Sequence, residues 1–278
     1  MSLAGALDQL GRTKQAREAY RKALRPIDNI VEGCRRAMYV VPSDAETPRL
    51  LAGALMRKAR CHEYLGEYGE ALVAYSDAQA MDGTEAMALF GKGRILRNLG
   101  RVEEALRSYR ETIELAPWFR QAYREADEVY VELGDADARV AAWRDMARGH
   151  PDEGLAHVHL GMALESAGDV QAALEAYRQA LAINPDNSMI YAKIDGLHLE
   201  RNDYSARVEE WRQATREYPD SVWANYFLGL ALPASGDLDG AVEAFRRACA
   251  LEPDNEVMQG SLRQAIIEAG KVEDGGVL

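Results

Sequence analysis

The ionisable side chains that could perform chemistry are few and poorly placed for it. His157 and His159 are two residues apart, so a helix would point them about 200° apart and they could not share a metal ion. The carboxylates of Glu209 and Glu210 lie at an expected helix start, where negative charge favours the helix dipole. No glycine-rich phosphate loop follows a strand pattern. We therefore predict a non-enzyme with no catalytic residue, no cofactor and no metal site.

The overall charge and the apolar runs limit the classes of partner. A net charge of −12 argues against a general nucleic-acid binder, since phosphate binding usually needs a basic face. No run approaches the ~18 apolar residues of a membrane span, and the first residues lack a signal-peptide pattern. Cys34, Cys61 and Cys249 form no CxxC pair, as is typical of reduced cysteines in a cytosol. We expect a cytoplasmic protein with no membrane or nucleic-acid partner.

A fixed period of 34 residues organises the elements of the chain. Prolines recur at this step from Pro117 to Pro253, and glycines recur at the same step from Gly66 to Gly270. The one gap in the glycine series holds Asn202, the residue type that best replaces glycine in a left-handed turn. The period indicates a repeat protein whose units must stack on one another to bury their apolar faces.

Within one unit the spacing is helical. In residues 154–187, Leu160, Gly161 and Leu164 share one face, a turn follows at Gly168, and a second apolar face precedes a closing proline. The stretch HLGMALESAGDVQAALEAYRQALAINPDN resembles a tetratricopeptide repeat (TPR). The resemblance covers about four-fifths of the chain. It implies an all-α fold, a right-handed α-solenoid of antiparallel helix pairs.

The register of this repeat gives the expected domain organisation. We expect residues 52–269 to form the solenoid, preceded by a partial repeat, an extra helix and a loop in 1–51, and followed by a flexible tail in 270–278. Ser43 with Glu46, or Thr47 before Pro48, would start the helix after that loop. The expected units are 52–85, 86–119, 120–153, 154–187, 188–221, 222–255 and a C-terminal helix 256–269.

Alternate units agree more closely than neighbours. In units 120–153 and 188–221, the usual small residues on the two helices are replaced together, by Asp127 with Arg139 and by Asp195 with Arg207. We predict a salt bridge within each of these units, with the tryptophan four residues beyond the arginine covering the guanidinium. A ligand-binding role for the acid is the alternative.

The resemblance also implies a binding surface, because the first helices of such repeats line a concave groove. At the implied groove positions the first three full repeats carry four arginines, and nine of the twelve positions in the next three are apolar. The resulting candidate partner-binding residues are Arg57, Arg60, Phe90, Arg94, Arg97, Arg124, Leu155, Val158, Met162, Met189, Trp223, Tyr226, Phe227 and Leu230.

These residue types favour a protein or peptide partner. Apolar anchors suit a partner helix or extended segment, and the arginines would favour an acidic stretch. The alternatives are that the apolar side chains pack between helices and that the arginines form only a solvated face. We expect a scaffold or adaptor. The other functions considered are a self-assembling homo-oligomer and, because Met1 falls within a helix of the register, the recognition region of a larger enzyme.

Overall fold

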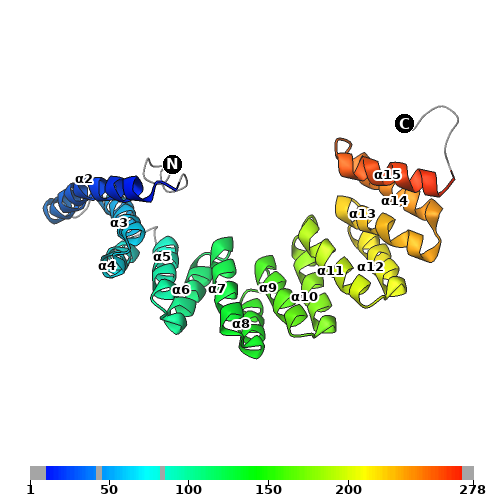
Figure 1. The fold of residues 1–278 in the computed structure, drawn as a ribbon, viewed down its shortest axis with the longest axis horizontal. Helices are drawn as coiled ribbons and strands as arrows, with labels where there is room; N and C mark the ends of the chain where they lie inside the picture. The colour runs from blue at the N-terminus through cyan, green and yellow to red at the C-terminus, as the bar shows by residue number, and fades with distance from the viewer. Residues whose placement is uncertain (1–10, 42–45, 82–84, 271–278) are drawn as a thin grey trace. The chain divides into compact units, whose positions relative to one another are not determined.

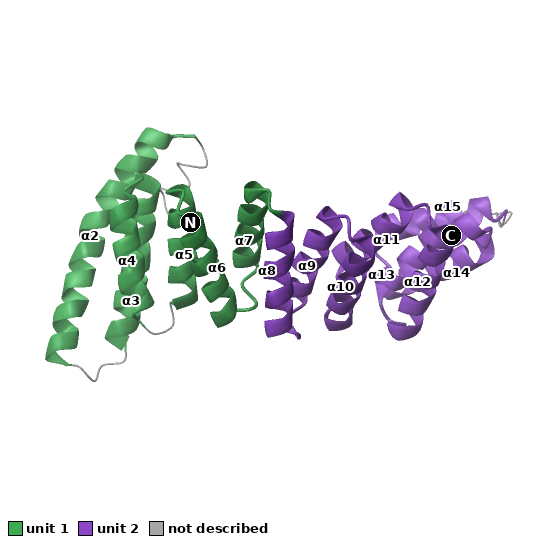
Figure 2. Cartoon of the chain, turned by 90° about the horizontal axis from the view of Figure 1, so that it is seen from below, with its two compact units in different colours: residues 1–135 green, residues 136–278 purple. Residues whose placement is uncertain are grey.

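The structure is a computed structural model that describes residues 11–41, 46–81 and 85–270. Every regular element of these residues is a helix, and the chain divides into two compact units, residues 1–135 and 136–278 (Figures 1 and 2). The helices of unit 1 are α2 (Thr13–Val40), α3 (Glu46–Leu65), α4 (Tyr68–Gln79), α5 (Glu85–Asn98), α6 (Val102–Leu115) and α7 (Arg120–Leu133).

Unit 2 continues the same pattern of helix pairs. Its elements are α8 (Ala136–Gly149), α9 (Gly154–Ser166), α10 (Val170–Ile183), α11 (Ser188–Glu200), α12 (Tyr204–Glu217), α13 (Val222–Ala231), the 3-10 turn η1 (Leu232–Ser235), α14 (Leu238–Leu251) and α15 (Glu256–Glu268). In each unit a helix packs on the next one along the chain, which makes an all-α solenoid. The division between the units falls within the expected repeat 120–153.

The turns between paired helices have the backbone that the glycine series predicts. Six glycines of the series, from Gly66 to Gly270, have φ between +67° and +81°. Asn202 fills the gap with φ +55° and is the one non-glycine residue with positive φ in the described chain. The prediction that asparagine replaces glycine there is confirmed. At the opposite ends of the repeats, Asn187 and Asn255 cap α11 and α15 by accepting backbone N–H bonds at 3.2 and 3.3 Å.

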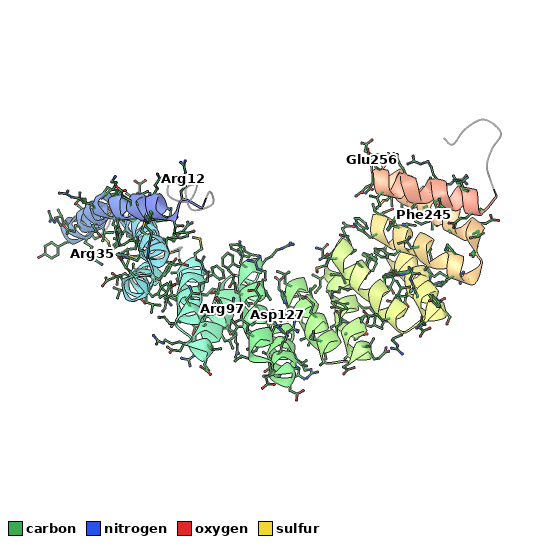
Figure 3. All side chains as sticks on the ribbon, in the orientation of Figure 1. Arg12, Arg35, Arg97, Asp127, Phe245 and Glu256 are labelled. Atoms are coloured by element: carbon green, nitrogen blue, oxygen red, sulfur yellow. The ribbon has the colours of Figure 1, made fainter. Side chains whose placement is uncertain are left out.

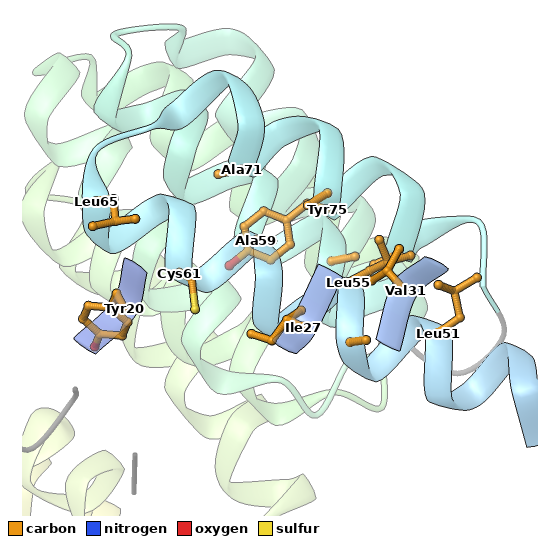
Figure 4. Close-up of a cluster of buried hydrophobic side chains, with 14 of the residues drawn as sticks. Tyr20, Ile27, Val31, Leu51, Leu55, Ala59, Cys61, Leu65, Ala71 and Tyr75 are labelled. Atoms are coloured by element: carbon orange, nitrogen blue, oxygen red, sulfur yellow. The ribbon is translucent and has the colours of Figure 1, made fainter. Parts of the chain in front are cut away.

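The N-terminal region differs from the expectation of a separate extra helix. Instead, α2 runs unbroken for 28 residues through Pro26. An internal proline costs about 3 kcal/mol, but the helix buries Tyr20 before it and Ile27 and Val31 after it in one cluster with α3 (Figure 4). That shared apolar face offsets the lost hydrogen bond. The expected loop, residues 40–47, is shorter than predicted at both ends, because Val40 belongs to α2 and α3 begins at Glu46. Its residues 42–45, and the expected tail apart from Gly270, lie outside the described residues.

The two helices of a repeat meet most closely where an aromatic ring lies on a small residue. A Cβ added at Gly161 would lie 2.5 Å from the Tyr177 ring, and one added at Gly229 would lie 2.8 Å from the Phe245 ring. Both rings are buried. The eighth residue of these repeats must therefore be glycine while the twenty-fourth is Tyr or Phe.

We expect the left-handed turn to make Asn202 replaceable by glycine but not by alanine. Asn202→Ala should lower the free energy of unfolding by about 1 kcal/mol, because a Cβ without a local hydrogen-bonding group is strained at positive φ. Asn202→Gly should leave it unchanged or raise it. Urea unfolding followed by circular dichroism measures both. Equal stability of the two variants would contradict the argument.

Candidate functional site

The arginines of unit 1 that were predicted to contact a partner fall into two groups, those without an ion pair and those already paired within the chain. Arg57 and Arg60 are exposed on α3 and make no ion pair with any described residue. Arg94, on α5, instead pairs with the buried carboxylate of Glu63, which also accepts the Tyr75 hydroxyl at 2.9 Å. Its guanidinium also lies 5.9 Å from the centre of the Phe90 ring. Arg94 therefore ties α5 to α3.

Arg97, labelled in Figure 3, makes ion pairs with three carboxylates of described residues. It contacts Glu125 at 2.8 Å, Glu128 at 3.1 Å and Glu132 at 2.5 Å, all on α7. Hydrogen bonding to Glu132 raises the pKa of Arg97. Arg124 lies 3.7 Å from Glu125 and 3.8 Å from Glu128. The charges of these two arginines are therefore offset within the chain, which reduces what they offer an acidic partner.

Unit 1 also exposes an aromatic cluster, of which the sequence predicted Phe90 but not Trp118 or Phe119. Phe90 and Phe119 meet edge to face at 4.9 Å, and Trp118 lies 6.0 Å from Phe119. Trp118 is 74% exposed, and Met87 is exposed on the same helix as Phe90. Trp118 lies in the turn after Pro117, outside the first helices from which groove positions are taken. A tryptophan directly after a repeat-closing proline, in an expected loop, is the signal that the sequence offered.

Two of the predicted contact residues in unit 2 belong to the core. Val158 is 3% exposed and Phe227 is 8% exposed. The Phe227 ring lies 5.9 Å from Tyr191 and 5.4 Å from Trp211, so it packs between repeats. Neither side chain is available to a partner, which corrects their assignment. They follow the alternative of packing between helices, because the stacking of repeats covers their positions. Leu155 and Met162 are half-buried on α9.

The remaining predicted residues leave an apolar surface on α11 and α13, two first helices that pack on each other. Met189 is 46% exposed, and Leu199 and Leu230 are also exposed. Trp223 and Tyr226 are half-buried and meet edge to face at 6.0 Å. Tyr226 also packs on Phe245 at 5.7 Å, so it supports the surface from below. We call Met189, Leu199, Trp223 and Leu230 the α11–α13 surface.

The salt bridge predicted for repeat 188–221 is present and buried. Arg207 donates from Nε to Asp195 Oδ1 at 2.6 Å and from Nη2 to Oδ2 at 2.9 Å, and both residues are 6% exposed. Trp211 does not act as predicted, since it donates its indole N–H to Asp195 at 2.8 Å. Arg207 also donates to the Leu230 carbonyl at 3.3 Å, and Arg139 donates to the Ser166 hydroxyl at 3.0 Å.

In the equivalent pair, Asp127 belongs to unit 1 and Arg139 to unit 2, so the salt bridge predicted between them remains a prediction. In repeat 188–221, Asp195 accepts three hydrogen bonds, two from Arg207 and one from Trp211, and lies on the helix face that packs on α12. These contacts favour the structural role of Asp195 over the alternative of a ligand-binding acid.

The pair should show strong coupling in a double-mutant cycle. Asp195→Ala or Arg207→Ala alone should cost about 3–5 kcal/mol, because each leaves a buried charge without its partner. The double variant should lose less than the sum of the two. Urea unfolding of the four proteins measures the coupling, and additive losses would contradict a buried pair.

A half-buried carboxylate, that of Glu210, links α10, α11 and α12. Arg178 donates to both oxygens of Glu210, at 2.9 and 2.5 Å, and His198 Nε2 lies 3.5 Å from the same carboxylate. Burial opposes ionisation of Glu210, but hydrogen bonds and positive charge from Arg178 and His198 outweigh it and lower its pKa to about 2. The cluster therefore stabilises the stack only while Glu210 is ionised.

This cluster predicts an acid-dependent loss of stability. The pKa of Glu210 is lowered, so its contribution is present above the ordinary value of 4.5 and is lost as the pH falls through about 2. Glu210→Gln should cost about 1–3 kcal/mol at neutral pH and flatten the decline in stability between these two values. Unfolding midpoints across this range, compared with the exposed control Glu200→Gln, measure it. An unchanged acid profile for Glu210→Gln would contradict the assignment.

The described residues do not converge on a metal-binding arrangement. No group of three or more His, Cys, Asp or Glu among them is placed to hold a metal ion. All three cysteines are unpaired. A cavity of about 450 Å³ between α6 and α7 is lined mainly by side chains of both charges, with Leu106 and Tyr130. No described helix has the length and apolar content needed to cross a bilayer.

Sequence comparison identifies the repeat type. Three models of the tetratricopeptide repeat match the chain, one at residues 154–187, another at 56–128 and 197–256, and a third at 1–25. Together they span more than half of the sequence. No curated protein matches it.

Solved structures of similar fold share little sequence with the chain. The C-terminal part of a TPR repeat-containing protein from Cytophaga hutchinsonii is 15% identical over 93% of this chain and 98% of that one, with a TM-score of 0.44. A tetratricopeptide repeat protein from Parabacteroides merdae is 15% identical over 95% and 96%, with a TM-score of 0.37. MamA, from residue 41 to its end, of Desulfovibrio magneticus RS-1 is 16% identical over 59% and 93%, with a TM-score of 0.40.

Proposed function

Because this chain belongs to the tetratricopeptide repeat family, we propose that it is a non-catalytic scaffold that holds a segment of a partner protein. The family is in general a protein-interaction module. The observation that carries the finer proposal is the α11–α13 surface, where exposed Met189, Leu199 and Leu230 share two adjacent first helices with Trp223. Apolar side chains beyond those that packing requires favour a binding surface.

The proposed partner segment is a helix or extended strand with two or more apolar side chains. A tryptophan beside flexible methionine and leucine side chains suits such anchors, since interface energy concentrates in a few large apolar contacts.

Unit 1 offers a second contact region of different chemistry. Arg57 and Arg60 are exposed on α3 without an ion pair to a described residue, and Phe90, Met87 and Trp118 supply apolar area. An acidic stretch of a partner would bind Arg57 and Arg60, because Arg94, Arg97 and Arg124 are already paired. A cytoplasmic location fits this role and remains part of the proposal. So does the alternative that the chain serves as the recognition region of a larger enzyme.

Selection from a displayed library of random peptides tests the α11–α13 surface. Wild-type protein should enrich peptides with paired apolar residues, and Trp223→Ala with Leu230→Ser should weaken their binding at least about tenfold, because the central anchor contact is lost. Fluorescence anisotropy with a selected peptide gives the dissociation constants. Tyr226 is left intact because its packing on Phe245 makes its removal destabilising.

The matched control is Tyr204→Ala, which removes an exposed aromatic ring from α12 instead. It should bind the selected peptides as the wild type does. Circular dichroism confirms that each variant is folded. Equal binding by the wild type and by Trp223→Ala with Leu230→Ser would refute the proposed surface.

A further inference from the structure

Charge is strongly segregated along this acidic chain. The described residues from 11 to 60, which form α2 and most of α3, contain twelve Lys or Arg and only four Asp or Glu. The described residues after them contain twenty Lys or Arg against thirty-six Asp or Glu. The net charge of −12 is therefore the sum of a basic N-terminal hairpin, formed by α2 and most of α3, and an acidic remainder.

Basic side chains form a stripe on the solvent face of α2, where the exposed acidic residues Glu18 and Glu32 are paired with Lys22 and Arg36. Lys14, Arg21 and Arg25 are exposed and, at 3.6 residues per turn, lie within about 40° of one another around the helix. None of them makes an ion pair with a described residue. The same face ends at Tyr39, which is 89% exposed, with exposed Val40 beside it. We call Lys14, Arg21, Arg25 and Tyr39 the α2 stripe.

Unit 2 carries an edge of complementary charge. An aspartate follows the closing proline in each loop that leads to a first helix, and each of these aspartates is exposed and makes no ion pair with a described residue. They are Asp152, Asp186, Asp220 and Asp254. Exposed Ile183, Leu251 and Val257 lie three residues from aspartates of this row. The edge thus combines regularly spaced carboxylates with apolar side chains.

We infer that the α2 stripe of one copy binds the aspartate edge of a second copy. Asp186 and Asp220 precede α11 and α13, which pack on each other, and packed helices lie about 8–10 Å apart. Lys14 and Arg21 are about 10 Å apart along α2, at 1.5 Å per residue. A straight basic stripe can therefore meet successive aspartates, while Tyr39 and Val40 contact the apolar residues of the edge.

A second copy fits these observations better than a lipid or nucleic-acid surface. Both a polyanion and a second copy carry net negative charge, but only the second copy also offers exposed apolar side chains that Tyr39 and Val40 can contact. The second copy supplies carboxylates at intervals that match the stripe. The contact joins two different surfaces, so a bound pair still has one free stripe, on one copy, and one free edge, on the other. The inference goes beyond the proposed function, since the α2 stripe and the α11–α13 surface share no residue.

Sedimentation velocity of the full chain over a range of concentrations tests this association. The wild type should form dimers and longer species whose fraction rises with concentration and falls with added salt. A stripe variant with Lys14→Gln, Arg21→Gln and Arg25→Gln should associate roughly tenfold or more weakly. An edge variant with Asp186→Asn, Asp220→Asn and Asp254→Asn should show the same loss.

An equimolar mixture of the stripe variant and the edge variant tests whether the stripe binds the edge directly. The edge of the stripe variant and the stripe of the edge variant are intact, so the mixture should form dimers and nothing longer. A control with Arg144→Gln, Arg201→Gln and Arg246→Gln removes the same charge from exposed positions of unit 2 and should associate as the wild type does.

Three results would overturn the inference. The first is a wild type that stays monomeric at every concentration, and the second is a stripe variant that associates normally. The third is a wild type that binds anionic phosphatidylserine vesicles or duplex DNA through the stripe while remaining monomeric. None of them affects peptide binding at the α11–α13 surface.

Discussion

The contact between an aromatic ring and the residue beneath it determines how each repeat closes. Where the ring is Tyr177 or Phe245, only glycine leaves room for it on the facing helix. Where it is Trp211, the facing residue is Asp195, whose carboxylate accepts the indole N–H and is neutralised by Arg207. The same helix pair is therefore closed by two chemically different contacts. Because these contacts alternate along the chain, a repeat resembles the second repeat after it more closely in sequence than it resembles its neighbour.

Charged residues on the first helices serve mainly to hold one repeat on the next. Glu63 accepts the Tyr75 hydroxyl and pairs with Arg94 of the following first helix. Glu165 repeats this arrangement, accepting Tyr177 at 2.5 Å and Lys193 at 3.0 Å. Many charged side chains at the groove positions are therefore paired with a neighbouring repeat and are not available to a partner. What remains for recognition is the apolar surface of α11 and α13 and the unpaired arginines of α3.

The sequence predicts local features well because they depend on local chemistry. Helix periodicity, the glycine turns, Asn202 and the pairing of Asp195 with Arg207 all follow from residues within one repeat. Contacts between repeats were less predictable. The burial of Val158 and Phe227, and the pairing of Arg97 with Glu125 and Glu132, depend on how neighbouring repeats stack, which spacing within one repeat does not specify. The passage of α2 through Pro26 was likewise decided by an apolar face that packs on another helix.

The buried ion pair and the proposed recognition surface are physically connected. Helix α13 ends at Ala231 and gives way to a 3-10 turn that contains Pro233, so the carbonyls of its last turn lack regular helical partners. Arg207, already held by Asp195, donates to one of them, the carbonyl of Leu230. The side chain of Leu230 is exposed on the α11–α13 surface. A polar interaction in the core of one repeat therefore fixes the end of the next first helix, and with it the position of an apolar contact residue. The buried pair of Asp195 and Arg207 therefore fixes the end of α13, which a glycine–aromatic contact such as that of Gly161 with Tyr177 would not do.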